Sequence, residues 1–454
     1  MWQSFDYAAS AGKALRRSPR RNELKNAHPR REFLRRAGTA AVVSAAGAFG
    51  RARVVRAGWT VSVLGAHDRL QPEWYQTKIQ QVQHEMAKHK LDAMVLLNST
   101  NVIYTTGYFH LSTERPLAVL IPKSGEPVLF IPGLETDQVK LGWIKDFESY
   151  FDYPGPENRV RWIFERVAKR GLSRGRIGIE DPPLGRLRQI KAGAPSARIV
   201  VAGELIERMR YVKDDDEIAI MRRAMEFADF TVQAGREFVA SRGSVTEDEI
   251  LKASADAVAD KMSRELRDVV GVSIDPPFGG LVPFGKRSAF PHAVPSQGRL
   301  QKGDALILSF GARVGGYNVE CERSFSIGKP SDRARRLYEA MLAAHDMGAG
   351  EMKDGAVAED VDRRALDQIR RAGFESFLRH RTGHGIGLEG HEPPWIAEGD
   401  KTVLRLGMTF SCEPGVYDPD FGGFRHSDTV VVAKERGEIM NRYPTRLEEM
   451  VIEV

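Results

Sequence analysis

The sequence predicts two consecutive domains, a smaller α/β domain followed by a larger α+β domain. A chain of 454 residues is too long for one ordinary hydrophobic core. Between residues 71 and 202, short apolar segments alternate with helical segments, which is typical of an α/β sheet. From residue 203 onward, long charged helices accompany glycine-rich hairpins, which favours helices outside a curved antiparallel sheet. We expect a leader at 1–57, a first domain at 58–203 and a second at 204–454.

The overall composition argues against two classes of protein. Hydrophobic residues make up 42% of the chain and charged residues 28%, as in soluble globular proteins. No run of about 18 apolar residues occurs, so we expect no integral membrane segment. The formal net charge is +6, but much of this excess lies in the leader, and no basic stripe with interleaved aromatic residues follows it. The sequence therefore predicts no nucleic-acid partner.

The leader has the order of features found in export signals. The stretch PRREFLRR at 29–36 contains a twin arginine, and small, weakly apolar residues follow it at 37–50. This order resembles a twin-arginine (Tat) signal, which implies export and a periplasmic or other extracytoplasmic location. A basic amphipathic N-terminal arm is the alternative interpretation.

The first domain is predicted from alternating helical and apolar segments. Residues 71–90 have a helical pattern, and a second helix at 160–171 ends at a glycine. Short strands are expected at 91–97, 117–122, 127–132 and 176–180.

The second domain is predicted to begin with a long charged helical region at 203–235. The next helix, at 246–266, opens with a capping box in which Thr246 precedes Glu249 by three residues. The other expected elements are helices at 333–348 and 357–372 and strands near 405–415 and 423–433.

A hairpin at 307–325, ILSFGARVGGYNVECERSF, carries the first group of polar residues. It turns at Gly315–Gly316, and its second strand brings Glu320 and Glu322 to one face, since residues two apart on a strand share a face. Its first strand has Ser309 where a matching carboxylate would be sought.

Only two cysteines occur, and each precedes a glutamate: Cys321 before Glu322, and Cys412 before Glu413. If both glutamates face a site, alternation along a strand turns both cysteines away from it. Two buried thiols are favoured over a disulfide, although the two could meet behind the sheet.

Side chains capable of chemistry gather in five short stretches of the second domain, each beside glycine or proline. In GHGIG, the glycines permit backbone geometry that other residues avoid and leave the imidazole of His384 approachable. Core packing alone does not explain five such clusters, so they predict an active site. The stretches carry His292; Ser309, Glu320 and Glu322; His384 and His391; Glu413; and Arg425, His426, Ser427 and Asp428.

The wording and order of GHGIGLEGHE and CEPG are similar to those of the creatinase/aminopeptidase P/methionine aminopeptidase family, the pita-bread hydrolases. The resemblance covers about residues 204–450, with a weaker match at 101–116 to the family's N-terminal domain. It implies an α+β pita-bread catalytic domain behind a smaller creatinase-type α/β domain. It also implies a homodimer in which the N-terminal domain of one chain closes the site of the other.

Metal-dependent members of this family bind two ions through two aspartates, one histidine and two glutamates. By resemblance, these positions are Ser309, Glu320, His384, Glu413 and Ser427. A serine hydroxyl is a poor ligand for a divalent cation, so we expect no dinuclear site and a metal-free enzyme without a cofactor. The alternative is one divalent ion (Mn, Zn or Co) held by Glu320, His384 and Glu413.

Creatinase is a metal-free member of the family, and several positions resemble it. The sequence ECER places Glu322 on its substrate-binding glutamate, and Glu413 matches the second such residue. His292 matches its catalytic histidine, and Arg115 matches the N-terminal arginine that holds a substrate carboxylate. Asn318 stands where creatinase has a binding tyrosine, so we do not expect creatine itself as substrate.

The residue types themselves favour hydrolysis. His292 can take a proton from water near neutral pH and return it. Glu322 and Glu413 would repel one another unless a cationic substrate group lay between them. Arg115 offers a fork for a carboxylate. We expect His292, Glu322, Glu413 and His384 to be catalytic, and Arg115, His391 and Glu320 to bind substrate.

The leading hypothesis is metal-independent hydrolysis of an amide or amidine C–N bond in a small amino-acid-like substrate. One alternative is a Xaa-Pro-type aminopeptidase or dipeptidase that uses one metal ion, and another is a non-catalytic pita-bread binding protein. Two structural interpretations also stay open: Glu322 could form a buried ion pair with Arg323, and Arg425 and Asp428 could lock the last hairpin.

Overall fold

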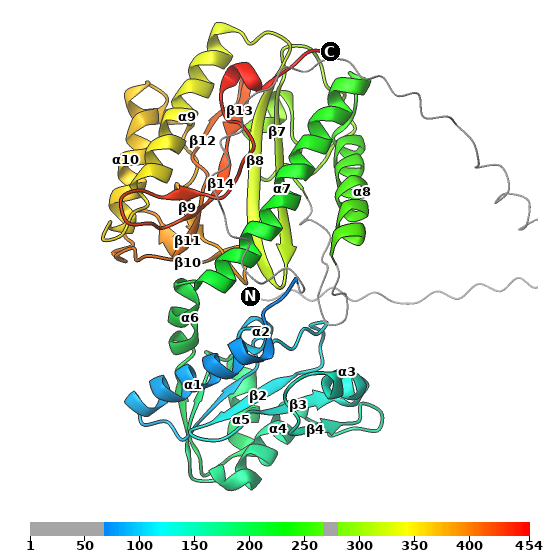
Figure 1. The fold of residues 1–454 in the computed structure, drawn as a ribbon, viewed down its shortest axis with the longest axis vertical. Coiled ribbons are helices and arrows are strands. Elements are labelled where there is room, and N and C mark those ends of the chain that lie inside the picture. Colours follow the sequence, from blue (N-terminus) through cyan, green and yellow to red (C-terminus); the bar gives the residue numbers. More distant parts are fainter. Residues whose placement is uncertain (1–67, 267–279) are drawn as a thin grey trace, which may run out of the picture. The chain divides into compact units, whose positions relative to one another are not determined.

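The computed structural model describes residues 68–266 and 280–454, which form two large sheets, each with its own helices, and one separate two-stranded pair (Figure 1). The predicted export signal lies outside these residues. Within the described ranges, no helix combines the length and apolar character needed to cross a lipid bilayer.

The first sheet has six strands in the order β4-β3-β2-β1-β5-β6. β2 is antiparallel to both β1 and β3, and the other neighbours are parallel. β1 is buried at every position, which explains its continuous apolar sequence. The strands are β1 (Ala93–Leu96), β2 (Ala118–Pro122), β3 (Val128–Pro132), β4 (Phe147–Tyr150), β5 (Arg176–Ile179) and β6 (Arg198–Val201).

Three of the five helices of this domain, at Ser99–Thr106, Thr136–Leu141 and Leu184–Gly193, were not predicted from the sequence. α2 arises from STNVIYTT, a segment rich in β-branched residues, because its ends are well capped. The Asn98 side chain accepts hydrogen bonds from the backbone of Thr100 and Asn101, and Gly107 ends the helix at a φ of 65°. The helices are α1 (Pro72–Lys88), α2 (Ser99–Thr106), α3 (Thr136–Leu141), α4 (Arg159–Val167) and α5 (Leu184–Gly193).

The long helix predicted at 203–235 is two helices, α6 (Glu204–Tyr211) and α7 (Asp215–Arg242). Asp214 begins α7 with a capping box that it shares with Glu217. The Lys213 backbone between the helices donates a hydrogen bond to the Gly407 carbonyl at 3.0 Å. The predicted continuous helix is therefore interrupted by the N-cap at Asp214 and by the hydrogen bond from Lys213 to Gly407.

The second sheet carries the site. It has eight strands, with β10-β9-β11-β14-β8-β16 in order, β7 paired to β8 and β15 paired to β14, and β12 and β13 pair separately. The predicted hairpin turns at Gly315–Gly316, where both φ angles are positive. The strands are β7 (Ala305–Val314), β8 (Tyr317–Ile327), β9 (Gly383–Gly385), β10 (Glu392–Ile396), β11 (Thr409–Cys412), β12 (Gly415–Asp418), β13 (Gly422–Arg425), β14 (Ser427–Val431), β15 (Glu438–Ile439) and β16 (Val451–Ile452).

Three further helices support this sheet: α8 (Glu247–Glu265), α9 (Asp332–Glu351) and α10 (Ala358–Arg371). The predicted capping box of α8 is confirmed, because Thr246 accepts a hydrogen bond from Glu249 and the Glu249 carboxylate accepts one in return. The two helices predicted at 333–348 and 357–372 are also present, as α9 and α10.

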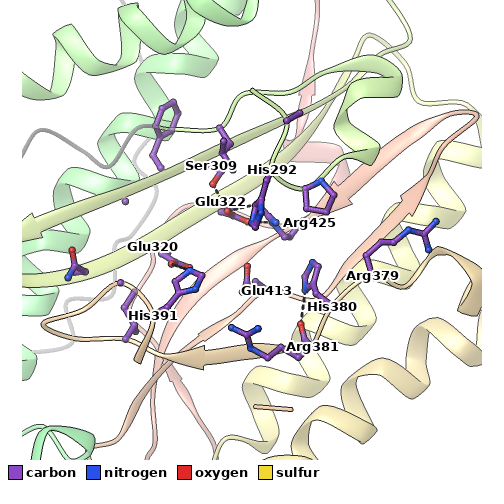
Figure 2. Close-up of a pocket in the computed structure, with 18 of the residues that line it drawn as sticks. His292, Ser309, Glu320, Glu322, Arg379, His380, Arg381, His391, Glu413 and Arg425 are labelled. Atoms are coloured by element: carbon purple, nitrogen blue, oxygen red, sulfur yellow. Dashed lines mark hydrogen bonds and ion pairs between the residues drawn. The ribbon is translucent and has the colours of Figure 1, made fainter. Parts of the chain in front are cut away.

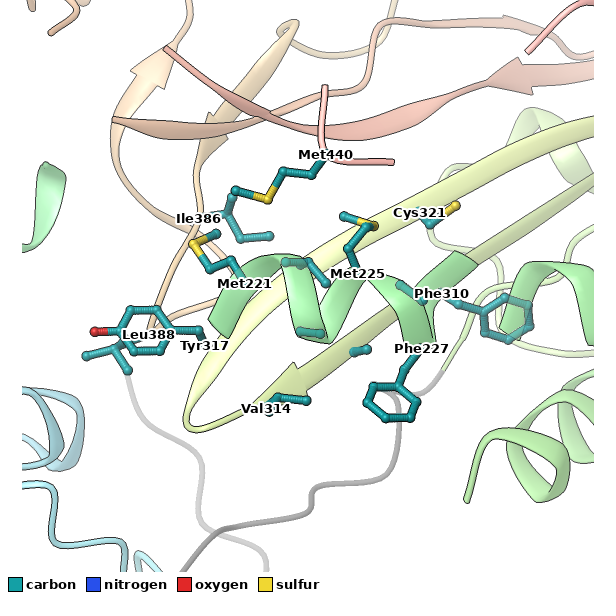
Figure 3. Close-up of a cluster of buried hydrophobic side chains, with 14 of the residues drawn as sticks. Met221, Met225, Phe227, Phe310, Val314, Tyr317, Cys321, Ile386, Leu388 and Met440 are labelled. Atoms are coloured by element: carbon teal, nitrogen blue, oxygen red, sulfur yellow. The ribbon is translucent and has the colours of Figure 1, made fainter. Parts of the chain in front are cut away.

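The core of the second domain lies between α7 and the β7–β8 hairpin (Figure 3). Met221, Met225 and Phe227 of α7 are buried in one cluster with Phe310 and Val314 of β7. Burying such side chains stabilises the fold by about 1.5–3 kcal/mol each. This packing holds one face of the hairpin against α7, so the side chains on the opposite face keep fixed positions.

Both cysteines are buried and unpaired, as predicted. Cys412 on β11 and Cys321 on β8 lie on strands that flank β14, and both are in register with Asp428. Burial raises the pKa of both thiols well above its usual value. The two thiols are therefore structural.

Candidate active site

A cavity of about 870 Å³ opens over the β7–β8 hairpin. In Figure 2, the labelled side chains of Glu320, His391, Glu413 and His292 point toward a common space. The lining includes seven of the positions in the five polar stretches: His292, Ser309, Glu320, Glu322, His391, Glu413 and Arg425.

His384 lies behind this lining. Its side chain is fully buried, and its ring stacks on that of His391 with centroids 3.8 Å apart. The Nδ1 atom lies 3.0 Å from the Gly385 carbonyl oxygen, which only accepts, so Nδ1 carries a hydrogen. The Nε2 atom points at the Glu413 and Glu320 carboxylates, at 3.3 and 3.7 Å, without a hydrogen bond to either.

The charges of this group are strongly coupled. Burial alone would lower the pKa of His384, but the Glu320 and Glu413 carboxylates overcome it and raise the pKa to about 9. Burial raises the pKa of Glu320 to about 7. Burial would also raise the pKa of Glu413, but His384 and Arg425 hold it down at about 2. The site is therefore arranged around a positive charge at His384 Nε2, from a proton or from a cation.

Glu322 is paired within the protein. Its Oε1 atom accepts a hydrogen bond from Arg425 Nη2 at 2.8 Å, its Oε2 atom binds Arg425 Nε, and the Ser309 hydroxyl also donates to it. The pair is almost fully buried. We expected a substrate cation next to Glu322 and Glu413, but beside Glu322 the protein supplies its own guanidinium.

The ion pair considered between Glu322 and Arg323 is wrong, whereas Arg425 and Asp428, considered as a lock on the last hairpin, each form a buried ion pair with a residue of β8. Arg323 pairs with Asp428 at 2.7 Å, and Asp428 also lies 3.1 Å from His345 Nε2. All three side chains are buried on the face of the sheet opposite the cavity. Successive side chains on β8 point to opposite faces of the sheet, so Arg323 points away from Glu322 and pairs with Asp428 instead.

The two serines at the expected ligand positions satisfy neighbouring carboxylates. The Ser309 hydroxyl donates to Glu322, and the Ser427 hydroxyl donates to Glu320 Oε2 at 3.2 Å. Neither serine adds a negative charge. The side of the cavity near Ser309 therefore holds the Arg425 cation and offers no free anion to a metal ion.

His292 lies at the edge of the cavity. Its side chain is exposed, and the loop that carries it is fastened by Glu247 at the start of α8. The buried Glu247 carboxylate accepts a hydrogen bond from the Ser296 backbone at 2.5 Å and pairs with Arg287 at 3.2 Å. The loop is therefore held on both sides of the histidine.

Arg115 does not join the cavity within one chain. It belongs to the first domain, where its guanidinium pairs with Glu114 at 2.8 Å and with Asp152 at 2.5 Å. The cavity lining does not include it. The predicted role of Arg115 in substrate binding therefore has no support from a single chain.

The glycines around His384 have a different function from the one predicted. Gly383 and Gly385 do not have positive φ angles, so the expected special backbone geometry is wrong. A Cβ atom on Gly383 would lie 2.0 Å from the Ser411 carbonyl oxygen, and one on Gly385 would lie 2.5 Å from that of Glu392. Glycine is required here because β9 is squeezed between β11 and β10.

The sequence analysis missed His380 and its partners. His380 lines the cavity, with Nδ1 2.7 Å from the Arg381 carbonyl oxygen and Nε2 2.7 Å from the Tyr417 hydroxyl. Because Nδ1 donates to the carbonyl, Nε2 accepts from Tyr417. Arg379 and Arg381 add positive charge to the same wall. The signal was available in RHRTGHG, where His380 precedes His384 by four residues.

The chain has a creatinase-type α/β domain followed in sequence by an α+β domain, whose sheet carries a cavity lined by histidines and carboxylates. This combination defines a two-domain hydrolase with a pita-bread catalytic domain. The description "Metallopeptidase family M24" matches residues 219–434, and "Creatinase/Prolidase N-terminal domain" matches 78–212. The chain belongs to metallopeptidase family M24. The predicted family and fold class are confirmed, while the domain limits 1–57, 58–203 and 204–454 stay a prediction.

Proteins similar to this chain include dipeptidases and prolidases. The Xaa-Pro dipeptidase of Lactobacillus delbrueckii subsp. lactis is 31% identical over 361 residues, which cover 79% of this chain and 94% of that protein. The prolidase from Pyrococcus horikoshii OT3 has 27% identity and a TM-score of 0.71, over 82% of this chain and 99% of its own. The Xaa-Pro dipeptidase from Bacillus anthracis has 26% identity and a TM-score of 0.71, over 84% and 100%. The chain is thus an enzyme that hydrolyses C–N bonds of the peptide type.

Proposed function

We propose that this protein is a Xaa-Pro-type dipeptidase that hydrolyses the C–N bond of a small dipeptide and uses one divalent metal ion. The observation that carries the proposal is His384 Nε2, a buried nitrogen without a hydrogen bond that points at the Glu320 and Glu413 carboxylates. Two carboxylates around this nitrogen call for a positive charge between them, and a divalent cation bound to the neutral imidazole would supply it. The names of the related dipeptidases support the same reaction.

The donor set fits one ion better than two. Glu320, His384 and Glu413 would hold the ion, which supplies Lewis-acid polarisation and an activated water when bound. Ser309 and Ser427 hold no charge, and Arg425 already places a cation beside Glu322. A second divalent ion would meet that guanidinium without a compensating carboxylate.

The residues of the chain have separate tasks in this proposal. His292 at the cavity edge moves a proton to the leaving nitrogen, since its exposed ring can exchange protons with solvent. Arg379 and Arg381 bind the substrate carboxylate from the wall of the cavity. The Arg425–Glu322 pair fixes the floor and keeps water out of the space behind the substrate.

A metal-free C–N hydrolase is the second candidate, and the two serines favour it. Because both hydroxyls donate to glutamates, a proton on His384 could balance the remaining charge without any ion. The expectation of a metal-free, cofactor-free site has no support among the relatives, whose names favour the peptidase alternative.

Metal analysis combined with turnover tests the choice. We expect the purified chain to bind one equivalent of divalent metal and to cleave Xaa-Pro dipeptides. A chelator should lower this activity by about 100-fold or more, and Zn, Mn or Co should restore it. His384→Ala should abolish metal binding, while His84→Ala, an exposed histidine of α1, serves as the control. Full turnover by metal-free protein would establish the second candidate instead, and no turnover of any Xaa-Pro dipeptide would reject the substrate class.

Two further features belong to the same proposal. The chain forms a homodimer, which is supported by large apolar side chains exposed in both domains, among them Leu111 at 81% and Val294 at 76%. The chain is exported through its twin-arginine leader. The test is whether the protein accumulates in a periplasmic fraction, and whether this accumulation is lost when Arg30 and Arg31 are both changed to lysine.

A further inference from the structure

We infer that His391 is a ligand of the metal ion and takes the place given to Glu413 above, so that two imidazoles and the Glu320 carboxylate form the binding set. This inference rests on the proposed function and deepens it, since the family resemblance gives His391 only a substrate contact. It assigns to this chain a nitrogen-rich site that replaces the ligands lost at Ser309 and Ser427.

The three donor atoms already converge. One ligand atom from each of Glu320, His384 and His391 lies within 4.8 Å of the other two. His384 Nε2 and His391 Nε2 approach the same carboxylate oxygen, Glu320 Oε1, at 3.7 and 4.0 Å. Ligand atoms on a tetrahedral zinc ion lie roughly 3.3 Å apart, because each is about 2.0–2.2 Å from the metal. The two separations from Glu320 Oε1 exceed this value by less than 1 Å.

The two imidazoles have complementary environments. His384 is fully buried, its Nδ1 is fixed by the Gly385 carbonyl, and its Nε2 has no hydrogen-bond partner. His391 stacks on it with 27° between the ring planes and keeps 60% of its side chain exposed. His384 is thus fixed beneath the site, and the exposed His391 ring has room to turn out of the stack so that its Nε2 can share an ion with His384.

The loop that carries His391 is held firmly although the side chain is exposed. The carboxylate of the next residue, Glu392, is buried and pairs with Lys213 at 2.7 Å and with Arg210 at 2.5 Å. Asn318 on β8 donates hydrogen bonds to the Gly387 and Leu388 carbonyls at 2.9 and 3.1 Å. These contacts on both sides keep the imidazole next to Glu320.

The donor types indicate which metal the site prefers. Two imidazoles with one carboxylate form a ligand set used by hydrolytic zinc enzymes, and this set leaves a position for water. Imidazole nitrogen favours Zn and Co over Mn, whose preferred ligands are carboxylate, carbonyl and water. The site should therefore bind Zn or Co more tightly than Mn, whereas a site with only oxygen ligands would favour Mn.

The test is zinc titration of metal-stripped protein by calorimetry, with X-ray absorption of the zinc-loaded enzyme to count imidazoles. We expect one zinc per chain and two imidazole ligands in the wild type. His391→Gln should weaken zinc affinity by about 100-fold or more and leave one imidazole. His292→Gln, which removes another imidazole from the same cavity, is the matched control and should leave affinity unchanged.

The outcomes distinguish the ligand role of His391 from the one-metal dipeptidase function on which it rests. One bound zinc with a single imidazole in the wild type, and equal affinity in His391→Gln, would overturn the role of His391 and leave the one-metal dipeptidase intact. A wild type that binds no zinc, cobalt or manganese would overturn both. Because the His391 side chain is largely exposed, we expect the variant to fold, which circular dichroism checks.

Discussion

At the scale of single residues, the site is defined by which charges are absent. Ser309 and Ser427 each donate a hydrogen bond to a glutamate, at two positions where the family resemblance implies carboxylate ligands. Neither serine carries a negative charge, and Arg425 adds a positive charge beside Glu322. In the proposed one-metal site, charge balance and not the shape of the cavity therefore excludes a second ion.

The Arg425–Glu322 pair gives a prediction about stability. Arg425→Met leaves a buried, unpaired carboxylate, so we expect a loss of about 3–5 kcal/mol in the free energy of unfolding. Adding Glu322→Gln should recover a good part of this loss, since the remaining group is then neutral. Urea denaturation of both variants measures the difference. A double variant that is no more stable than Arg425→Met would show that the pair contributes by packing and not by charge.

Some residue contacts could be predicted from the sequence, and others depended on pairing. Alternation placed Glu320 and Glu322 on the cavity face and both cysteines behind it. The partner of Glu322 could not be predicted, because Arg425 lies 103 residues away and meets it through the register of β14 against β8. One sequence gives alternation within a strand and says nothing of which strands pair.

At the scale of elements, the long helices and the main hairpin could be predicted from the sequence. A short helix held by its caps, and features that depend on tight packing between strands, could not. The hairpin at 307–325 and the helix beginning at Thr246 followed from turn and capping signals. The helix α2 was missed, since its caps outweigh its β-branched composition. The reason for glycine at 383 and 385 became visible only with β10 and β11 in place.

The start of α7 gives a prediction about pH. Burial raises the pKa of Glu217 from 4.5 to about 7, although Lys78 lies 3.7 Å away, and the Tyr317 hydroxyl donates to its Oε1 at 2.7 Å. Between these two pH values the unfolded chain releases this proton and the folded chain keeps it. Stability from this group is therefore complete below about pH 4.5 and falls as the pH rises to about 7.

Glu217→Gln removes this dependence. Relative to the wild type, the variant should gain roughly 3 kcal/mol in unfolding free energy between about pH 4.5 and pH 8. Denaturant titrations at several pH values measure the gain. Glu237→Gln, on the exposed side of the same helix, controls for the loss of one surface charge. An equal stability difference at all pH values would contradict the role assigned to Glu217.

At the scale of the whole molecule, the proposed homodimer gives the remaining prediction. Leu111 and Phe151 of the first domain are 81% and 69% exposed, and burying such side chains against a second chain would favour association. We expect light scattering to give twice the mass of one chain. Replacing both residues by glutamate should shift the mass toward that of a monomer and lower dipeptidase activity.

The control for this experiment is Leu184→Glu, which changes another exposed leucine, at 67%, in the first domain. A wild type that elutes as a monomer would remove the dimer from the proposal, and with it the prospect that Arg115 reaches a cavity on another chain. The metal site would be unaffected, since all its donors come from one chain.

The buried cysteines have a practical consequence for studying such questions. Both native thiols have no exposed surface, and the full sequence holds no others. A cysteine introduced on the loop around His292 would therefore be the single site at which a maleimide dye or spin label reacts with the folded protein. The mobility of that single label could then be followed during substrate turnover without first removing any native cysteine.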